Sequence, residues 1–150
     1  MKINNIEETL EFAIGKEQEA HDFYLDLAAR ADRPGMKTIF TQFAGEELGH
    51  KNKLVAIKSG KRMLPKDEKV MDLKISDYVV DVEPSQDLDY QKALILAMKK
   101  EKAAFRLYTD IANQTDDNEM KLTFLALAQE EAKHKLRFEV EYDDMILTEN

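Results

Sequence analysis

The sequence predicts an all-α protein, an antiparallel four-helix bundle of two repeated helix hairpins joined by a long crossover. Charged residues make up 35% of the chain, which has only five glycines and three prolines, a composition typical of helical proteins. Apolar residues recur at alternating intervals of three and four, the period of a helix with one buried face. An internal repeat then predicts that both halves of the chain share one design.

The first hairpin is predicted over residues 6–58. Its first helix covers residues 6–31, and Asp32-Arg33-Pro34-Gly35 is expected to end it before a second helix from about Met36 to Lys58. The two core-facing stripes consist of Leu10, Ala13, Glu17, Ala20, Tyr24, Leu27 and Ala31, and of Ile39, Phe43, Glu47, His50, Leu54 and Ile57.

The second hairpin is predicted over residues 87–146, after a crossover at residues 59–86. The crossover lacks a helical period, and a short ordered piece is expected at about residues 71–82. A connection of this length can run back along a helix and start the next one parallel to it. Asp87 or Asp89 is expected to cap the third helix, and the fourth is expected from Glu119 to Ile146. We expect one domain over residues 1–150.

The internal repeat appears when residue n is placed over residue n+84. Residues 7–56 and 91–140 then match at 17 of 50 positions without a gap, counted directly from the sequence. The matches include Glu17/Glu101, Tyr24/Tyr108, Glu47/Glu131 and His50/His134. Two hairpins of the same design are expected to pack about a pseudo-two-fold axis.

Each hairpin places three polar residues on its core-facing stripe. They are Glu17, Glu47 and His50 in the first hairpin and Glu101, Glu131 and His134 in the second. Burying such groups without compensation costs roughly 1–3 kcal/mol or more for each. Four carboxylates and two imidazoles suit two divalent first-row metals, each held by a histidine and one terminal glutamate, with Glu47 and Glu131 as bridges. Buried salt bridges or satisfied core polar groups are the alternative.

Several residues near these candidate ligands also need an interpretation, and two pairs of them have two alternatives. Tyr24 and Tyr108 lie two turns after Glu17 and Glu101, where each hydroxyl would orient a carboxylate of the opposite hairpin or simply belong to a packed core aromatic. His21 has Phe105 as its repeat partner and is expected to be a non-ligand. Gly45 and Gly49 indicate either a crowded neighbour or an opening for a small oxidant.

Taken together, these motifs make the chain resemble the ferritin-like di-iron superfamily, and most closely the erythrin domain of rubrerythrins. The resemblance rests on Glu17 with Tyr24, Glu47-Leu48-Gly49-His50, Glu101 with Tyr108, and Glu131-Ala132-Lys133-His134. It covers nearly the whole chain. Rubrerythrins carry a further glutamate where this chain has Ala104, and a rubredoxin-like domain with four cysteines, whereas this sequence has no cysteine. The remaining symmetric six-ligand set also looks like that of bacterioferritins.

The resemblance implies an oxidoreductase with two iron ions, for which manganese or zinc are possible substitutes. Its substrate would be hydrogen peroxide or dioxygen, and its electrons would come from a separate donor protein such as a rubredoxin. The alternatives are a ferroxidase of bacterioferritin type and a non-catalytic, metal-dependent binding module. We also expect a homodimer.

Charge and hydropathy exclude other classes of function. The net charge is −8, and no basic cluster exists beyond residues 58–66, so nucleic acid is not an expected partner. The sequence has no apolar run near the roughly 20 residues needed to cross a bilayer, and its first residues lack an apolar signal core. A cytoplasmic protein without membrane association is expected.

Overall fold

The computed structural model describes residues 2–3, 5–60, 73–74, 77–80 and 89–149. Within these ranges the chain forms four long α-helices and two strands of two residues each, so the predicted all-α class is confirmed. The chain divides into two compact units, Lys2–Leu73 and Lys74–Asn150, and each unit is built on one helix hairpin. None of the described helices is long and apolar enough to cross a membrane.

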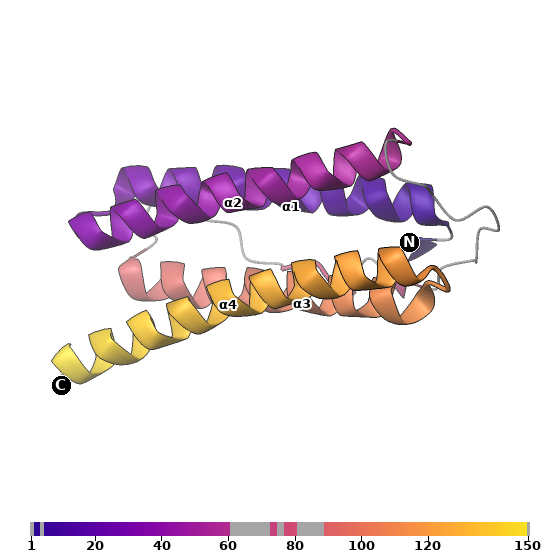
Figure 1. Cartoon of the computed structure of the whole chain (residues 1–150). Coiled ribbons are helices and arrows are strands. Elements are labelled where there is room, and N and C mark those ends of the chain that lie inside the picture. The colour runs from indigo at the N-terminus through magenta and orange to yellow at the C-terminus, as the bar shows by residue number, and fades with distance from the viewer. Residues whose placement is uncertain (1, 4, 61–72, 75–76, 81–88, 150) are drawn as a thin grey trace. The chain divides into compact units, whose positions relative to one another are not determined.

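The first hairpin consists of α1, Ile6–Arg30, and α2, Pro34–Lys58, which lie side by side (Figure 1). The side chain of Asn5 caps α1 by accepting a hydrogen bond of 2.8 Å from the backbone N–H of Glu8. The expected break between the helices lies at residues 31–33, and Pro34, which was expected within the break, is instead the first residue of α2. Proline is well suited to the first helical position because the N–H that it lacks would have no partner in the helix.

Aromatic rings fill much of the first hairpin. Tyr24 on α1 is fully buried, and its ring stacks on Phe40 of α2 with 6.4 Å between the centroids. Phe43, one turn further along α2, meets the edge of the same tyrosine at 6.4 Å. The same core also contains Phe23 and aliphatic side chains such as Leu10, Leu27, Leu54 and Ile57. These contacts hold the two helices in a fixed register.

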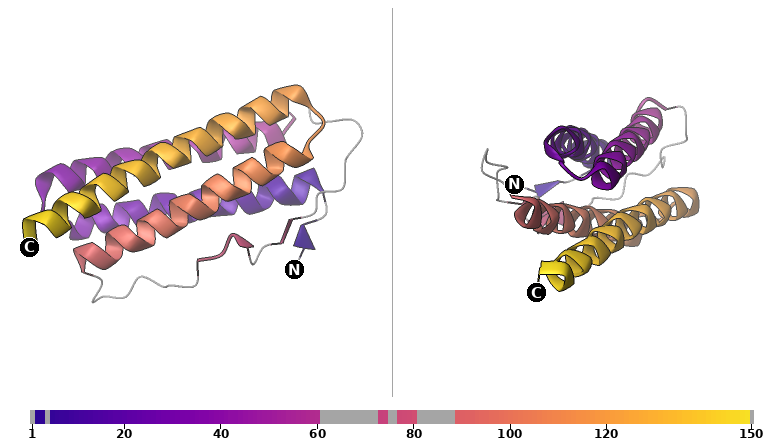
Figure 2. Two further views of the ribbon diagram at one scale, coloured as in Figure 1. Left: turned by 90° about the horizontal axis from the view of Figure 1, so that it is seen from below. Right: turned by 90° about the vertical axis from the view of Figure 1, so that its left-hand side faces the viewer.

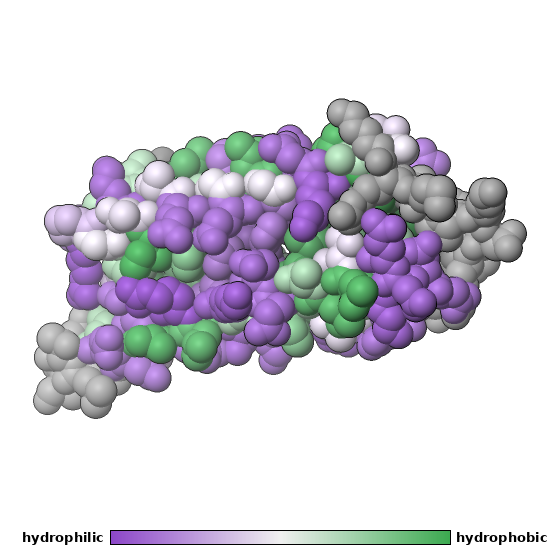
Figure 3. Space-filling view, in the orientation of Figure 1, coloured by the Kyte–Doolittle hydropathy of each residue, from purple (hydrophilic) through white to green (hydrophobic). Residues whose placement is uncertain are grey.

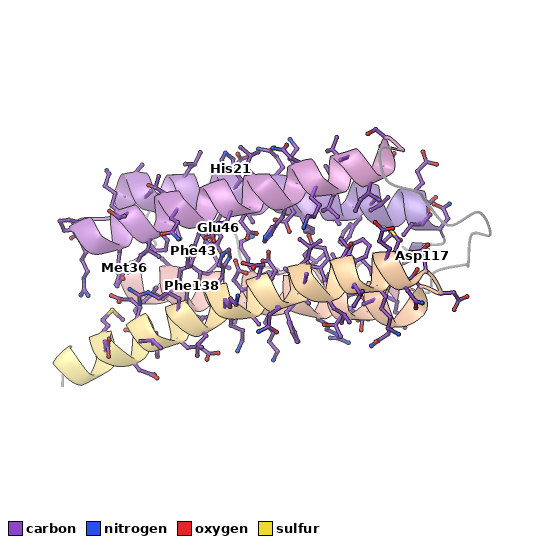
Figure 4. All side chains as sticks on the ribbon, in the orientation of Figure 1. His21, Met36, Phe43, Glu46, Asp117 and Phe138 are labelled. Carbon is purple, nitrogen blue, oxygen red and sulfur yellow. The ribbon has the colours of Figure 1, made fainter. Side chains whose placement is uncertain are left out.

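The second hairpin consists of α3, Tyr90–Gln114, and α4, Asn118–Glu149 (Figure 2). Asp89 rather than the alternative Asp87 caps α3, since its Oδ1 accepts from the N–H of Lys92 at 2.8 Å. Asp117 does the same for α4 through the N–H of Met120 (Figure 4). The helix α4 continues to Glu149 and is therefore longer than the predicted span.

The core of the second hairpin repeats that of the first. Tyr108 is buried and stacks on Phe124 at 5.9 Å, and these residues correspond to Tyr24 and Phe40 in the repeat. At the far end, Tyr90 donates a hydrogen bond of 2.9 Å to Glu141. Because the start of α3 lies beside Glu141, the residues of α4 that follow project about two turns beyond their partner helix.

Part of the crossover packs as two short pieces. The strand β2, Leu73–Lys74, pairs with β1, Lys2–Ile3, near the start of the chain. Tyr78 is buried, and its hydroxyl donates a hydrogen bond of 2.6 Å to Asp110 of α3. The rest of the ordered piece expected at residues 71–82 lies outside the described residues, and the single-domain organisation stays a prediction.

Candidate metal centre

The first hairpin brings together the three polar residues that the sequence places on its inner stripe. Glu47 and His50 are one turn apart on α2, and Glu17 lies on α1. The Nδ1 of His50 is 3.7 Å from Oε1 of Glu17 and 3.6 Å from Oε1 of Glu47. One ligand atom from each residue lies within 4.8 Å of the others. The 30-residue spacing of the two glutamates thus brings them to one level of the hairpin.

The second hairpin contains the same cluster. Glu131 and His134 lie on α4 and Glu101 on α3, with 3.6 Å between Nδ1 of His134 and Oε1 of Glu101. Again one ligand atom of each residue lies within 4.8 Å of the others. We refer to Glu17, Glu47 and His50 as the first triad and to Glu101, Glu131 and His134 as the second triad. Both consist of two carboxylates and one imidazole.

The geometry of each triad fits a metal ion better than a set of hydrogen bonds. Separations of 3.6–3.7 Å between histidine and glutamate are longer than a hydrogen bond. Two ligand atoms that each lie about 2.1 Å from one ion are at most about 4.2 Å apart. The histidine–glutamate separations fall within that limit. Carboxylate oxygen and imidazole nitrogen are also the donors that first-row divalent metals accept together.

Burial of the carboxylates favours a compensating positive charge. All four glutamates of the triads are buried, Glu131 completely. Two ionised carboxylates about 4 Å apart repel by roughly 4 kcal/mol at an effective dielectric of 20. One dication in each triad would neutralise both carboxylates and leave the imidazole neutral, which is the state in which it can bind a metal. That the six residues are metal ligands stays a prediction.

The two triads differ in exposure. The side chain of His50 is 12% exposed, whereas that of His134 is 3% exposed. On α2, a Cβ added to Gly45 or Gly49 would meet no atom within 4 Å, so the expected crowded neighbour is absent at both glycines among the described residues. The repeat partners of these glycines are the exposed residues Gln129 and Lys133. The surface of α2 is therefore more open around its histidine than the surface of α4.

Neighbouring polar residues do not join the triads. The Nδ1 of His21 lies 2.7 Å from the carbonyl oxygen of Ala44, which explains its place in the first hairpin without a metal. Glu46 and Glu130 are partly exposed and belong to neither group of possible ligands; Figure 4 places His21 and Glu46 on the first hairpin. Tyr24 and Tyr108 are buried, and their proposed role beside the ligands stays a prediction.

One polar contact was not anticipated from the sequence. The hydrogen bond of Tyr78 to Asp110 fastens the crossover to α3, and Arg106 lies 3.9 Å from Asp77 beside it. Asp26 is the repeat partner of Asp110, but its Oδ2 lies 3.1 Å from Nε of Arg30 on the same helix. A polar residue shared by both repeats is therefore used differently in each, and only the folded chain reveals it.

Comparison with known proteins supports the fold. The Rubrerythrin family model matches residues 8–142, which is most of the chain. This chain belongs to the rubrerythrin family. It is also similar to the solved structure of a hypothetical protein from Pyrococcus furiosus, with a TM-score of 0.71, 27% identity, and coverage of 91% of this chain and 87% of that one. No curated protein matches.

Membership of the rubrerythrin family indicates which fold and which kind of metal centre to expect. Rubrerythrins are ferritin-like helical proteins, so the match confirms the resemblance that the paired Glu-x-x-His motifs indicate. The family also implies binding of a di-iron centre, and each triad supplies donor atoms of the required chemistry. Ala104, which is partly exposed on α3, stands where the family pattern expects a further glutamate.

Proposed function

We propose that this rubrerythrin-family protein is an oxidoreductase that reduces hydrogen peroxide, or dioxygen, at a dinuclear iron site formed by both triads. The observation that carries the proposal is the pair of matching buried triads, each with two carboxylates and one imidazole. An ion pair would need one such cluster at most, whereas a twice-repeated set has the composition of a two-metal site. Manganese or zinc would fit the same donors.

The residues of the chain have separate tasks in this function. When bound, the two metals supply the electrons for reduction of peroxide to water, which takes up two electrons and two protons. The two histidines and the terminal glutamates Glu17 and Glu101 would each hold one ion, and Glu47 and Glu131 would be the ligands shared by both. The buried aliphatic and aromatic side chains of both hairpins limit water around the carboxylates, which strengthens every charge interaction there.

Tyr24 and Tyr108 are proposed to orient carboxylate ligands through their hydroxyl groups. Their stacking on Phe40 and Phe124 restricts the rings and so directs the hydroxyls. Because the sequence holds no cysteine, electrons would come from a separate donor protein such as a rubredoxin. A homodimer acting in the cytoplasm completes the proposal, with no nucleic acid or membrane as a partner.

A second candidate is a ferroxidase, which oxidises iron(II) as its substrate and passes on iron(III). The observation that favours it is Ala104, because without the additional family glutamate the six ligands form a symmetric set like that of bacterioferritins. A metal-dependent binding module without turnover is the third candidate.

Rapid mixing separates these functions. The anaerobic iron(II)-loaded protein is mixed with peroxide or with dioxygen in a stopped-flow spectrometer, and oxidation is followed by absorbance. Oxidation that is much faster with peroxide supports the peroxidase. Faster oxidation by dioxygen, combined with a large assembly on sizing, would support the ferroxidase. If neither reagent oxidised the iron, the non-catalytic binding module would be the remaining candidate.

The ligand assignment is tested by metal content after substitution in either repeat. Each of four variants is expected to bind fewer than two metal ions per chain because it lacks one direct metal ligand. These variants are Glu131→Ala and His134→Ala and, in the first repeat, Glu47→Ala and His50→Ala. Inductively coupled plasma mass spectrometry measures the ratio. His21→Ala is the matched control and should keep the wild-type metal content. Two ions per chain in His134→Ala would contradict the assignment.

A further inference from the structure

Two polar links join α1 and α2 within about one helical turn of the first triad. The ammonium group of Lys51 on α2 donates a hydrogen bond of 2.6 Å to Oε1 of Gln18 on α1, and the amide nitrogen of Gln18 donates to Asp22 over 2.9 Å. The Nδ1 of His21 on α1 donates to the carbonyl oxygen of Ala44 on α2 over 2.7 Å. Hydrophilic residues cover much of the outer surface of α2 (Figure 3), so polar contacts as such are ordinary there. These two matter because each joins one helix to the other beside the ligands.

The positions of the linked residues explain why they bear on the first triad. Gln18 directly follows Glu17, and Lys51 directly follows His50. The second link joins the residue four after Glu17 to the residue three before Glu47. The two links therefore hold the stretches of backbone that carry all three ligands of this triad.

The internal repeat shows that the lysine link belongs to the first hairpin alone. Lys135 is the repeat partner of Lys51, so both hairpins carry the donor. Gln18, however, corresponds to Lys102, whose side chain can donate but cannot accept a hydrogen bond. Lys135 instead pairs with Glu139, one turn along its own helix. The same lysine therefore joins two helices in the first hairpin and stays within one helix in the second.

The histidine link is also specific to the first hairpin. His21 corresponds to Phe105, whose side chain has no group for such a hydrogen bond. The second hairpin has interhelical hydrogen bonds of its own, but those of Tyr90 and Gln91 lie about three turns before Glu101. The two links beside the first triad thus have no equivalents at the matching positions of the second hairpin.

The links have their largest effect when no metal is bound. Glu17 and Glu47 lie on different helices, so repulsion between their carboxylates in an empty triad tends to separate α1 from α2. The hydrogen bonds of Lys51 and His21 oppose that separation. A site whose ligands are already in place loses less binding energy to arranging them. The ligands of the second triad, which lack these two links, have to be brought together to a greater extent as an ion binds.

We propose that the two metal sites fill in order, with the first ion bound at the first triad, and that Gln18 and Lys51 are positioning residues that set this order with the help of His21. The inference rests on the proposed two-metal function and adds an order of binding to it. The greater exposure of His50 relative to His134 also gives an incoming ion easier access to the first triad.

Calorimetric titration of zinc(II) into the metal-free chain tests the order of binding. Zinc(II) fits the donor atoms and does not change its oxidation state during the experiment. We expect two binding steps whose dissociation constants differ at least about tenfold. His134→Ala should retain the tighter step, and His50→Ala should lose it. Two equal steps in the wild type, or loss of the tighter step in His134→Ala alone, would overturn the order.

Gln18→Leu tests the positioning role, because it removes the acceptor of Lys51 without changing the net charge. It should raise the first dissociation constant about tenfold and the second by less than about threefold, with two ions still bound at saturation. The matched control is Gln91→Leu, which removes an interhelical hydrogen bond far from the ligands and should leave both constants nearly unchanged. Equal effects of the two variants would mean that the bond only stabilises a hairpin, which would contradict the positioning role.

Lys51→Met tests the same link from its other end. Loss of a positive charge beside the triad would by itself favour a cation, so weaker binding of the first ion can be attributed to the lost hydrogen bond. Lys51→Arg keeps a donor and should retain the tighter step. Unchanged binding of the first ion in Lys51→Met would overturn the positioning role.

Failure of the proposed function gives different results from failure of this inference. A wild-type chain that binds fewer than two zinc ions would overturn the two-metal site itself, and the order of binding with it. Two ions bound with equal constants would overturn the order and leave the two-metal site in place. A lack of reaction with peroxide would count against the proposed reaction and leave the order of zinc binding as expected.

Discussion

Residues of one type in this protein are buried or exposed according to their position around the helix. Glu46 and Glu47 are neighbours in sequence, yet Glu46 remains partly exposed while Glu47 is buried beside His50. A helix turns by about 100° per residue, so adjacent side chains point to different surroundings. The chemical role of a glutamate here follows from its phase on the helix, and the same holds for Glu130 and Glu131 on α4.

Tyr78 is the residue whose protonation the fold alters most clearly. Burial, followed by the hydrogen bond and charge of Asp110, raises the pKa of Tyr78 well above the ordinary value for tyrosine. A pKa raised on folding means that the folded protein holds the proton more tightly than the unfolded chain. The resulting stabilisation is therefore complete below about pH 10 and declines as the pH rises toward the folded pKa.

We expect Tyr78→Phe to lower the free energy of unfolding by about 1 kcal/mol at about pH 8, because the hydrogen bond to Asp110 is lost. The difference from wild type should shrink at about pH 10.5, where the unfolded wild-type chain ionises its tyrosine. Urea unfolding followed by circular dichroism at both pH values measures this. A difference that is independent of pH would contradict the role assigned to this proton.

At the scale of elements, the helices of the two hairpins were predictable in number and position, and the start of α2 and the end of α4 were the ends that differed most. The apolar stripes of α1 and α3 follow directly from the helical period, so the sequence indicates them without knowledge of the packing. The start of α2 at Pro34 depends instead on which residues near the turn adopt helical angles. The extension of α4 to Glu149 likewise has no apolar period to mark its end.

The glycines of α2 provide a test at this scale. Gly45 and Gly49 are exposed helical residues with open space at their Cβ positions. Gly45→Ala and Gly49→Ala are each expected to raise the free energy of unfolding by up to about 1 kcal/mol, since alanine restricts the unfolded chain and favours the helix. Thermal or urea unfolding reports the change.

The control for the glycine substitutions is Gly60→Ala, which should destabilise the protein. Gly60 follows the end of α2 with a φ of +80°, a backbone conformation that alanine adopts only at a cost. If alanine at positions 45 and 49 gave no stabilisation but slowed oxidation by peroxide, the glycines would serve as the opening for the oxidant beside His50. That result would support the interpretation of these residues as an opening for a small oxidant.

At the scale of the whole molecule, the triads link folding to metal binding. Each hairpin buries two glutamates in positions where other helices hold apolar residues, and the metal-free state must bear that cost. A ligand that binds only the folded state stabilises it by about 2.7 kcal/mol when its concentration is 100 times its dissociation constant. Occupied and empty forms of the protein should therefore differ clearly in stability.

Removal of metal is expected to lower the melting temperature, and added iron(II), manganese(II) or zinc(II) should restore it. Differential scanning calorimetry of the chelator-treated protein before and after metal addition measures the shift. The same addition should raise the melting temperature of Glu131→Ala much less, because one triad is incomplete. A shift of equal size in this variant and in the wild type would show that the metal acts at another place on the chain.

The sequence by itself determined the helical class, the repeat, the family and the two sets of candidate ligands. These features follow from helical periodicity and residue spacing, which require no long-range information. Only the tertiary structure decided that Glu17 and Glu101 reach within 4 Å of their histidines, that Tyr78 is held by Asp110, and that Lys51 is held by Gln18 across the first hairpin. Such facts depend on contacts between segments distant in sequence, where packing of the whole hairpin fixes the distance and a local pattern does not.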